Sequence, residues 1–153
     1  MRKPTIFILL MMSLTGCASG PAKDVYGNFV QDIPAVDGKM MADDVAKKLV
    51  VLFPPALTGI NLQHTTSDAF GTSLVGALCT KGYALSEFKP AQSDSAPGSA
   101  ATSGGVALAY VVDQQLEARS YRITVHINSQ LLSRLYEAKG GGIAPAGYWV
   151  REE

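Results

Sequence analysis

The sequence predicts an α+β fold, in which two helices pack on a mainly antiparallel sheet of about four to five strands, preceded by an extended lipidated tether. Three observations predict it. Two stretches repeat apolar residues at helical spacing, the C-terminal third alternates apolar and polar residues, and Gly- and Pro-rich segments separate these stretches. The expected organisation is a signal peptide at 1–16, a tether at 17–36 and a single domain at 37–153.

Composition narrows the class of protein. The chain has 153 residues and 47% apolar content, which is ordinary for one globular domain. Its 13 basic and 13 acidic residues balance, so a basic surface for binding nucleic acid is not expected. Loss of Arg2 and Lys3 with residues 1–16 would leave the mature chain at a net charge of −2.

Residues 1–16 have the layout of a secretory signal peptide. Arg2 and Lys3 form a basic start, and an uninterrupted apolar run follows from Ile6 to Met12. A membrane-spanning helix needs about 20 apolar residues. This run is much shorter, so we expect it to be cleaved rather than to remain as an anchor.

The next segment, Leu14-Thr15-Gly16-Cys17, resembles the lipobox of bacterial lipoproteins. In that class the Cys thiol receives a diacylglyceryl group and the peptide is cut before it, so Cys17 is the predicted lipid attachment residue and membrane lipid the first expected partner. Two or more acyl chains hold a protein stably on a bilayer. Ala18 replaces the Asp that favours inner-membrane retention, which favours the outer membrane with the domain facing the periplasm. The alternative is a secreted protein with an incidental Cys.

The predicted tether at 17–36 contains an aromatic-apolar segment from Val25 to Val30. Within it, Tyr26, Asn28 and Phe29 are the candidate partner-binding residues. Two interpretations stay open: the segment folds back onto its own domain, or it docks on a partner by adding to a sheet edge. Turn-forming residues interrupt any longer element here: Gly20, Pro21, Gly27 and Pro34.

The first helix is expected over residues 38–53, with Asp37 as its N-cap and Pro54 ending it. Its apolar residues recur on one face: Met41, Val45, Leu49, Leu52 and Phe53. Two acid-before-base pairs at i,i+4 spacing are expected to mark the solvated face: Asp43 with Lys47, and Asp44 with Lys48.

A strand–helix–strand unit is expected next, from an extended stretch at 57–65 to a strand at 83–88. Ser67 or Asp68 would cap the helix, and Gly82 would follow its end. The predicted buried face consists of Phe70, Leu74, Ala77 and Leu78. Cys79 is expected to be a buried small hydrophobe, because a lipidated Cys17 leaves it no disulfide partner in the chain; an intermolecular disulfide is the alternative.

The alternation of apolar and polar residues in the C-terminal third predicts strands. An Ala/Ser/Gly-rich flexible loop at 91–105 precedes strands at 106–112 and 121–127, and the latter shows the clearest alternation in the chain. Residues 131–138 fit a strand or a short helix, and the turn predicted at 128–130 favours a strand. A last strand at 147–151 carries the only Trp; Tyr148 and Trp149 are expected in the core, with an exposed aromatic patch as the alternative.

The sequence shows no catalytic constellation, so we expect a protein that is not an enzyme and has no cofactor. His64 and His126 lie in unrelated segments without metal-ligand spacing, and His126 falls on the polar side of its strand, where it would be solvated. There is no GxSxG motif. The glycines at 140–142 lack the Lys-Ser/Thr of a phosphate-binding loop, so no catalytic residue and no metal ligand is predicted.

The chain as a whole resembles the TrbH family of conjugal-transfer lipoproteins. Besides the lipobox, the resemblance depends on the order and combination of five segments: Tyr26-Gly27-Asn28-Phe29, Asp68-Ala69-Phe70-Gly71, Tyr110-Val111-Val112-Asp113, Leu132-Ser133-Arg134-Leu135-Tyr136 and Ala144-Pro145-Ala146-Gly147-Tyr148-Trp149-Val150-Arg151. It implies a component of a mating-pair-formation apparatus, a type IV secretion system, and supplies no catalytic residue.

Two functions are therefore weighed. The first is an outer-membrane lipoprotein that acts as a structural or assembly component of a conjugative secretion channel, with protein partners in the outer-membrane core. The second is an envelope lipoprotein, unrelated to conjugation, that binds a small apolar ligand or cell-wall component.

Overall fold

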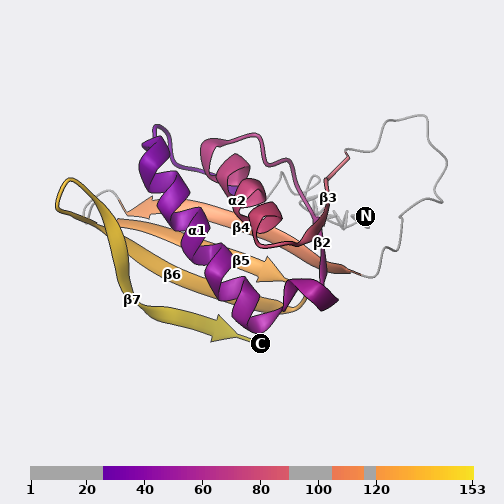
Figure 1. The fold of residues 1–153 in the computed structure, drawn as a ribbon. Helices are drawn as coiled ribbons and strands as arrows, with labels where there is room; N and C mark the ends of the chain where they lie inside the picture. Colours follow the sequence, from indigo (N-terminus) through magenta and orange to yellow (C-terminus); the bar gives the residue numbers. More distant parts are fainter. Residues whose placement is uncertain (1–25, 90–104, 116–119) are drawn as a thin grey trace, which may run out of the picture.

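A computed structural model describes residues 26–89, 105–115 and 120–153. Seven strands form one mixed sheet in the order β3-β2-β4-β5-β6-β7, with β1 beside β4. Both helices lie on one face of this sheet (Figure 1). The predicted signal peptide, Cys17 and positions 91–104 of the predicted loop lie outside the described residues.

Helix α1 covers Ala35–Leu52 and begins three residues earlier than predicted. Pro34 precedes the first turn, which leaves Asp37 inside that turn instead of capping it. Such a start is favourable, because the proline fixes its own φ and an acidic residue suits the positive end of the helix dipole. Met41, Val45 and Leu49 are buried as their spacing predicts. No helix among the described residues is long and apolar enough to cross a membrane.

Helix α2 covers Ala69–Thr80, and Asp68 is its N-cap. The predicted buried face is confirmed at all four positions, and Gly82 follows the helix with a positive φ of 89°. The prediction for Cys79 is wrong, because its side chain is exposed. Cys79 follows Leu78 by about 100° around the helix, which turns it away from the buried stripe.

The N-terminal half supplies the parallel part of the sheet. It contains β1 (Gly27–Asn28), the short 3-10 helix η1 (Pro55–Leu57), β2 (Gly59–Leu62) and β3 (Ala84–Ser86). Strands β2 and β3 pair in parallel across α2, as the predicted strand–helix–strand unit requires. Strands β1 and β2 both pair in parallel with the same side of β4 (Gly105–Gln115), β2 along its first part and β1 further on.

The C-terminal half is an antiparallel meander of β4, β5 (Ser120–Ile127), β6 (Gln130–Lys139) and β7 (Gly142–Glu152). The strand predicted at 131–138 is confirmed as β6. Two-residue turns connect β5 to β6, at Asn128–Ser129, and β6 to β7, at Gly140–Gly141; three of these residues have the positive φ that tight hairpins need. Strand β7 begins five residues before the prediction, immediately after the second turn.

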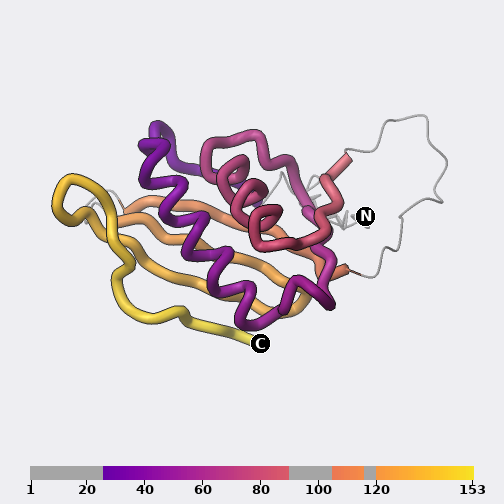
Figure 2. Tube along the Cα trace, viewed as in Figure 1, coloured from indigo at the N-terminus to yellow at the C-terminus, as the bar shows by residue number. Residues whose placement is uncertain are grey.

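The predicted α+β class, the two helices and the mainly antiparallel pairing are confirmed, but the expected number of four to five strands needs correction. The sheet has seven strands and contains parallel pairs. Strands β2 and β3 lie within the extended stretches predicted at 57–65 and 83–88, whereas β1 has only two residues, which is too short for an alternating pattern to reveal it. Figure 2 shows β2 and β3 at one edge of the sheet and β7 at the other.

The described part of the predicted tether lies on the domain. The backbone N–H of Phe29 donates to Val112 O over 2.9 Å, continuing the pairing of β1 with β4. Val30 packs against the core and Ile33 is part of it, with 8% of its surface exposed. The domain therefore includes residues 26–36, and only residues before Tyr26 remain as a predicted tether.

One apolar core lies between the helices and the sheet. Helix α2 lies over β4 and contacts β3 and β1, while α1 reaches β6 and β7. The largest fully buried side chains come from both layers: Tyr110, Tyr136, Phe70, Met41, Leu49, Ile60, Leu74, Leu78, Leu108, Ile123, Ile127 and Leu132. Each buried side chain of this size stabilises the fold by about 1.5–3 kcal/mol.

Candidate functional site

The ring of Tyr26 contacts both histidines of the chain. It stacks on His64 with 6.0 Å between ring centroids and meets His126 edge-on at 5.0 Å. His64 in turn contacts Tyr110 at 4.4 Å, and Tyr110 contacts Phe70 at 4.9 Å. We call these five residues the aromatic row.

His64 fills a gap along the edge of β4. The end of β2 is continued by a hydrogen bond from Gln63 N to Leu108 O, and β1 begins opposite Val111. Between these points the N–H of Tyr110 donates to Nε2 of His64 over 3.2 Å. Nδ1 lies 2.9 Å from Thr65 O, so a neutral ring with its proton on Nδ1 satisfies both contacts. A side chain thus completes the hydrogen bonding of a sheet edge.

Asp68 connects the aromatic row to helix α2. Its Oδ1 accepts from the N–H groups of Phe70 and Gly71, at 3.1 and 3.0 Å, and its Oδ2 accepts from the hydroxyl of Tyr110. Burial, followed by the hydrogen bond to this carboxylate, raises the pKa of Tyr110 well above its ordinary value. Tyr110 is therefore a permanent donor that holds the start of α2 on β4.

Gly71 makes room for this hydrogen bond. A Cβ at this position would overlap the hydroxyl of Tyr110 and lie 2.9 Å from the carboxylate of Asp68. The segment Asp68-Ala69-Phe70-Gly71 thus combines three roles: a helix cap, a buried ring against Tyr110 and a position without a side chain. The sequence analysis identified the cap but not the reason for the glycine.

The three candidate partner-binding residues differ in how far their side chains are exposed to solvent. Tyr26 is 36% exposed and Phe29 is 60% exposed, so each presents apolar surface to solvent. The side chain of Asn28 turns back on its own segment, where Oδ1 accepts from the N–H of Val30 over 2.9 Å. Tyr26 and Phe29 are therefore the two that are placed to touch a partner, and Asn28 shapes the turn that presents them.

His126 is half-buried, which corrects the expectation of a solvated side chain. It lies on the sheet face opposite the helices, but the ring of Tyr26 lies against it. Burial lowers the pKa of His126 below its ordinary value. The alternation of β5 placed His126 on the correct face and could not show that the N-terminal segment returns to that face.

A cleft of about 300 Å³ opens beside the aromatic row, between β1 and the loop before α2. Tyr26 and His64 contribute to its wall together with Ser67, Asp68 and Phe88. Among the described residues no group of three His, Cys, Asp or Glu side chains is placed to hold a metal ion.

A second polar cluster, the Asp44 cluster, holds α1 on the sheet. Oδ2 of Asp44 accepts from Arg134 Nη1 at 2.9 Å and from the hydroxyl of Tyr136 at 2.8 Å. Arg134 also donates to Gly147 O and lies over the ring of Trp149, 5.7 Å from its centroid. The predicted pairing of Asp44 with Lys48 is wrong, because Asp44 faces β6 rather than solvent.

Of the other predictions near these clusters, some are wrong and one is confirmed. Asp43 pairs with Lys39, four residues before it, at 2.8 Å, rather than with Lys47. Trp149 packs against the core as predicted, whereas Tyr148 is 93% exposed and corresponds to the exposed alternative.

A family model described as conjugal transfer protein TrbH matches residues 23–153. No curated protein and no solved structure matches the chain. The segments that carry the resemblance in the sequence come together in the fold. Residues 26–29, 68–71 and 110–113 meet around the aromatic row, and residues 132–136 and 144–151 pair beside the Asp44 cluster.

Proposed function

The chain belongs to the TrbH family of conjugal transfer proteins, and from this membership we propose that it is an outer-membrane lipoprotein of a conjugative type IV secretion channel. In this proposal it serves as a structural or assembly component and catalyses no reaction. Its lipid is attached at Cys17, its domain faces the periplasm, and its partners are protein subunits of the outer-membrane core of the channel.

The distance from Cys17 to the domain supports a role close to the membrane. Tyr26 follows Cys17 by nine residues, and an extended chain spans at most about 3.3–3.6 Å per residue. A lipid on Cys17 would therefore hold Tyr26, the residue before β1, within about 30 Å of the bilayer surface. Any partner of β1 and the adjoining edge would have to lie in the same layer.

The observation that carries the proposal is the exposed aromatic surface at this end of the domain. The backbone N–H of Phe29 donates to Val112 O on β4, and 60% of the residue's surface is exposed. Aromatic side chains are enriched in protein interfaces. Phe29 is therefore the side chain that we expect to enter a partner.

The proposal is tested by capturing the tagged full-length protein from cells that carry the complete transfer operon. We expect channel subunits to be recovered with the unmodified protein and recovery to fall about tenfold with Phe29→Ala, since central aromatic anchors often contribute more than 1.4 kcal/mol to binding. Leu57→Ala is the matched control, because Leu57 is 88% exposed on a different element. Its recovery should be unchanged.

Labelled palmitate tests the anchor in the same cells. The unmodified protein should incorporate palmitate and Cys17→Ser should not. Palmitate on the Cys17→Ser variant would contradict the assigned lipid site. Undiminished DNA transfer in a deletion strain, together with no captured channel subunit, would contradict the proposed role in the channel.

A further inference from the structure

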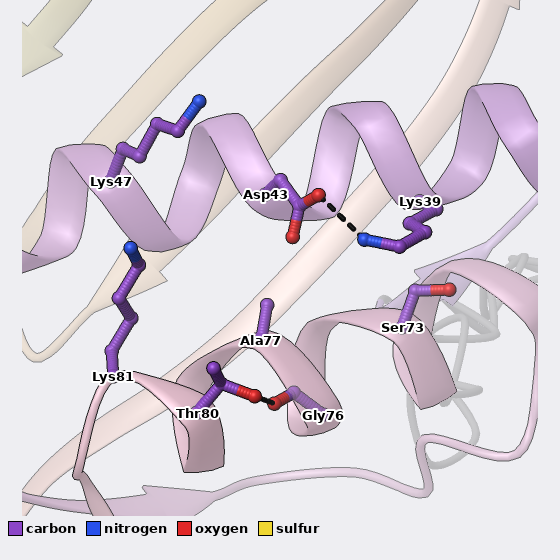
Figure 3. A pocket seen from close by; sticks show the side chains of 8 residues that line it. All are labelled: Lys39, Asp43, Lys47, Ser73, Gly76, Ala77, Thr80 and Lys81. Atoms are coloured by element: carbon purple, nitrogen blue, oxygen red, sulfur yellow. Dashed lines mark hydrogen bonds and ion pairs between the residues drawn. The ribbon is translucent and has the colours of Figure 1, made fainter.

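A groove of about 490 Å³ lies between α1 and α2, on the side of the helix layer away from the sheet. Three lysines from the two helices line it: Lys39 and Lys47 on α1, and Lys81 at the end of α2 (Figure 3). It is separate from the aromatic row and shares no residue with the cleft beside Tyr26.

The groove has an excess of positive charge. Asp43 is the one acidic residue among those that line it, and its carboxylate pairs with Lys39 at 2.8 Å. Lys47 and Lys81 make no ion pair with any described residue. With three lysines and one aspartate, the lining has a formal net charge of +2.

The fold alone explains one of the two unpaired lysines. Lys81 is the C-cap of α2, where a cation interacts favourably with the helix dipole. Lys47 lies well inside α1 and has no such partner. Figure 3 shows the side chain of Lys81 extending from α2 toward α1, whereas the ammonium group of Lys47 points away from α2. Both lysines are exposed, so a change of side-chain rotamer is enough to turn Lys47 toward an anion bound beside Lys81.

Gly76 leaves this groove open. It lies within α2, and a Cβ at its position would meet no atom within 4 Å. A glycine inside a helix weakens the helix relative to alanine, and no neighbouring atom requires a glycine here. Its effect is to leave free space beside the lysines, between the two helices.

The chemistry of the lysines favours phosphate over carboxylate. Recognition of a planar carboxylate is best served by the fork of an arginine, whereas lysine binds phosphate as a point charge. No arginine lines the groove. A phosphate monoester carries about −1.5 to −2 charges near neutral pH, which matches the charge of the lining. The volume also lies in the range of sites that hold small molecules, about 300–1,000 Å³.

We propose that the groove between α1 and α2 binds a phosphate monoester or a diphosphate, with Lys47 and Lys81 neutralising its charge. The ligand is either a free phosphate compound or the phosphate headgroup of a lipid. This site does not depend on the proposed role in the secretion channel, because it uses neither Cys17 nor Phe29.

The test uses the purified full-length protein in neutral detergent micelles and measures dissociation constants by titration. The probes are inorganic pyrophosphate and micelles doped with phosphatidic acid; micelles doped with phosphatidylcholine are the neutral control. Three variants are compared with the unmodified protein. Lys47→Gln/Lys81→Gln removes the unpaired charges, Gly76→Leu fills the space without changing charge, and Lys48→Gln/Lys89→Gln removes two lysines that do not line the groove.

We expect pyrophosphate or phosphatidic acid to bind, and the binding to weaken about tenfold in the first two variants while it stays within about twofold in the third. If pyrophosphate binds and competes with phosphatidic acid, a free phosphate compound is enough to occupy the groove. Binding of phosphatidic acid alone would identify a lipid headgroup. The proposal is overturned if neither probe binds, or if the two double lysine variants weaken binding equally.

Discussion

At the scale of single residues, Gly71 and Gly76 belong to the same helix and are glycines for opposite reasons. Gly71 is buried, and the hydroxyl of Tyr110 occupies the space that a Cβ would need. Gly76 is exposed, and nothing occupies the corresponding space. One glycine is required by packing, and the other lowers the stability of the helix without a packing reason.

The same substitution at the two positions should therefore have opposite effects. Gly76→Ala should raise the free energy of unfolding by about 0.5–1 kcal/mol, because alanine is the better helix former. Gly71→Ala should lower it by about 1–3 kcal/mol, because Tyr110 and Asp68 must move apart. Denaturant unfolding of both variants measures the difference. A loss of stability in both would show that the space beside Gly76 is not free.

His126 is the residue whose ionisation should affect stability near neutral pH. Its pKa in the folded protein is below the ordinary value of 6.5 because of burial, so the unfolded chain takes up a proton first as the pH falls. Between the two pKa values the unfolded state binds more protons, and stability therefore rises with pH in that window. Above about pH 6.5 this contribution is constant.

We expect the free energy of unfolding to decrease as the pH is lowered through this window and the decrease to be smaller in His126→Gln. The measurement is a series of denaturant titrations between pH 7.5 and pH 5, at roughly half-unit steps. Comparing slopes separates the ionisation of His126 from any constant effect of the substitution. Identical slopes in the two proteins would show that His126 is ionised equally in the folded and unfolded states.

At the scale of elements, each helix is fixed to the sheet by a carboxylate that accepts from a buried tyrosine. Asp68 at the start of α2 accepts from Tyr110 on β4, and Asp44 in α1 accepts from Tyr136 on β6. Burial and the hydrogen bond to the carboxylate raise the pKa of both tyrosines. Apolar packing supplies most of the attraction between the layers, and these bonds determine how each helix lies on its strand.

Asp43 and Asp44 are neighbours on α1 and should respond differently to the same change. Asp43→Asn breaks an exposed pair with Lys39 and should change the free energy of unfolding by less than about 0.5 kcal/mol. Asp44→Asn leaves Arg134 with an unpaired charge that is only 19% exposed, and should cost about 1–3 kcal/mol. Thermal or denaturant unfolding distinguishes the two. Equal effects would place Asp44 on the solvated face, as the sequence alone suggested.

At the scale of the whole molecule, β1 is the shortest strand of the described sheet. Strand β1 has two residues, whereas β4, β5 and β6 pair over eight to eleven residues each. Segments with little buried surface open locally without unfolding the rest. The edge of β4 covered by residues 26–29 is therefore the edge that can be uncovered most easily.

Hydrogen exchange should show this difference directly. The amide of Phe29, which donates to Val112 O, should exchange through local opening and be much less protected than the amide of Ile123 in the centre of the sheet. The amide of Gln63 is the matched control, because it donates to Leu108 O on the same edge of β4 but does not belong to β1. Equal protection of Phe29 and Ile123 would mean that β1 opens only when the whole domain unfolds.

The sequence by itself determined the elements whose pattern is local. The buried faces of α1 and α2, the cap at Asp68 and the alternation of β5 follow from spacings of two to four residues, and the structure confirms each of them. Neighbouring residues in one element share a face because of helix and strand geometry, whatever the rest of the chain does. The resemblance to the TrbH family is likewise confirmed by the family match over residues 23–153.

Only the tertiary structure decided which distant groups meet. His64 bonds to Tyr110 across 46 positions, and Asp44 pairs with Arg134 across 90. In the sequence each of these residues had a sufficient local explanation, as an isolated histidine or as a solvated acid. Strands β1 and β2 both pair in parallel with β4, which follows them by more than 40 residues in the chain. The physical reason is that such contacts are fixed by the packing of whole layers, and no short-range spacing encodes them.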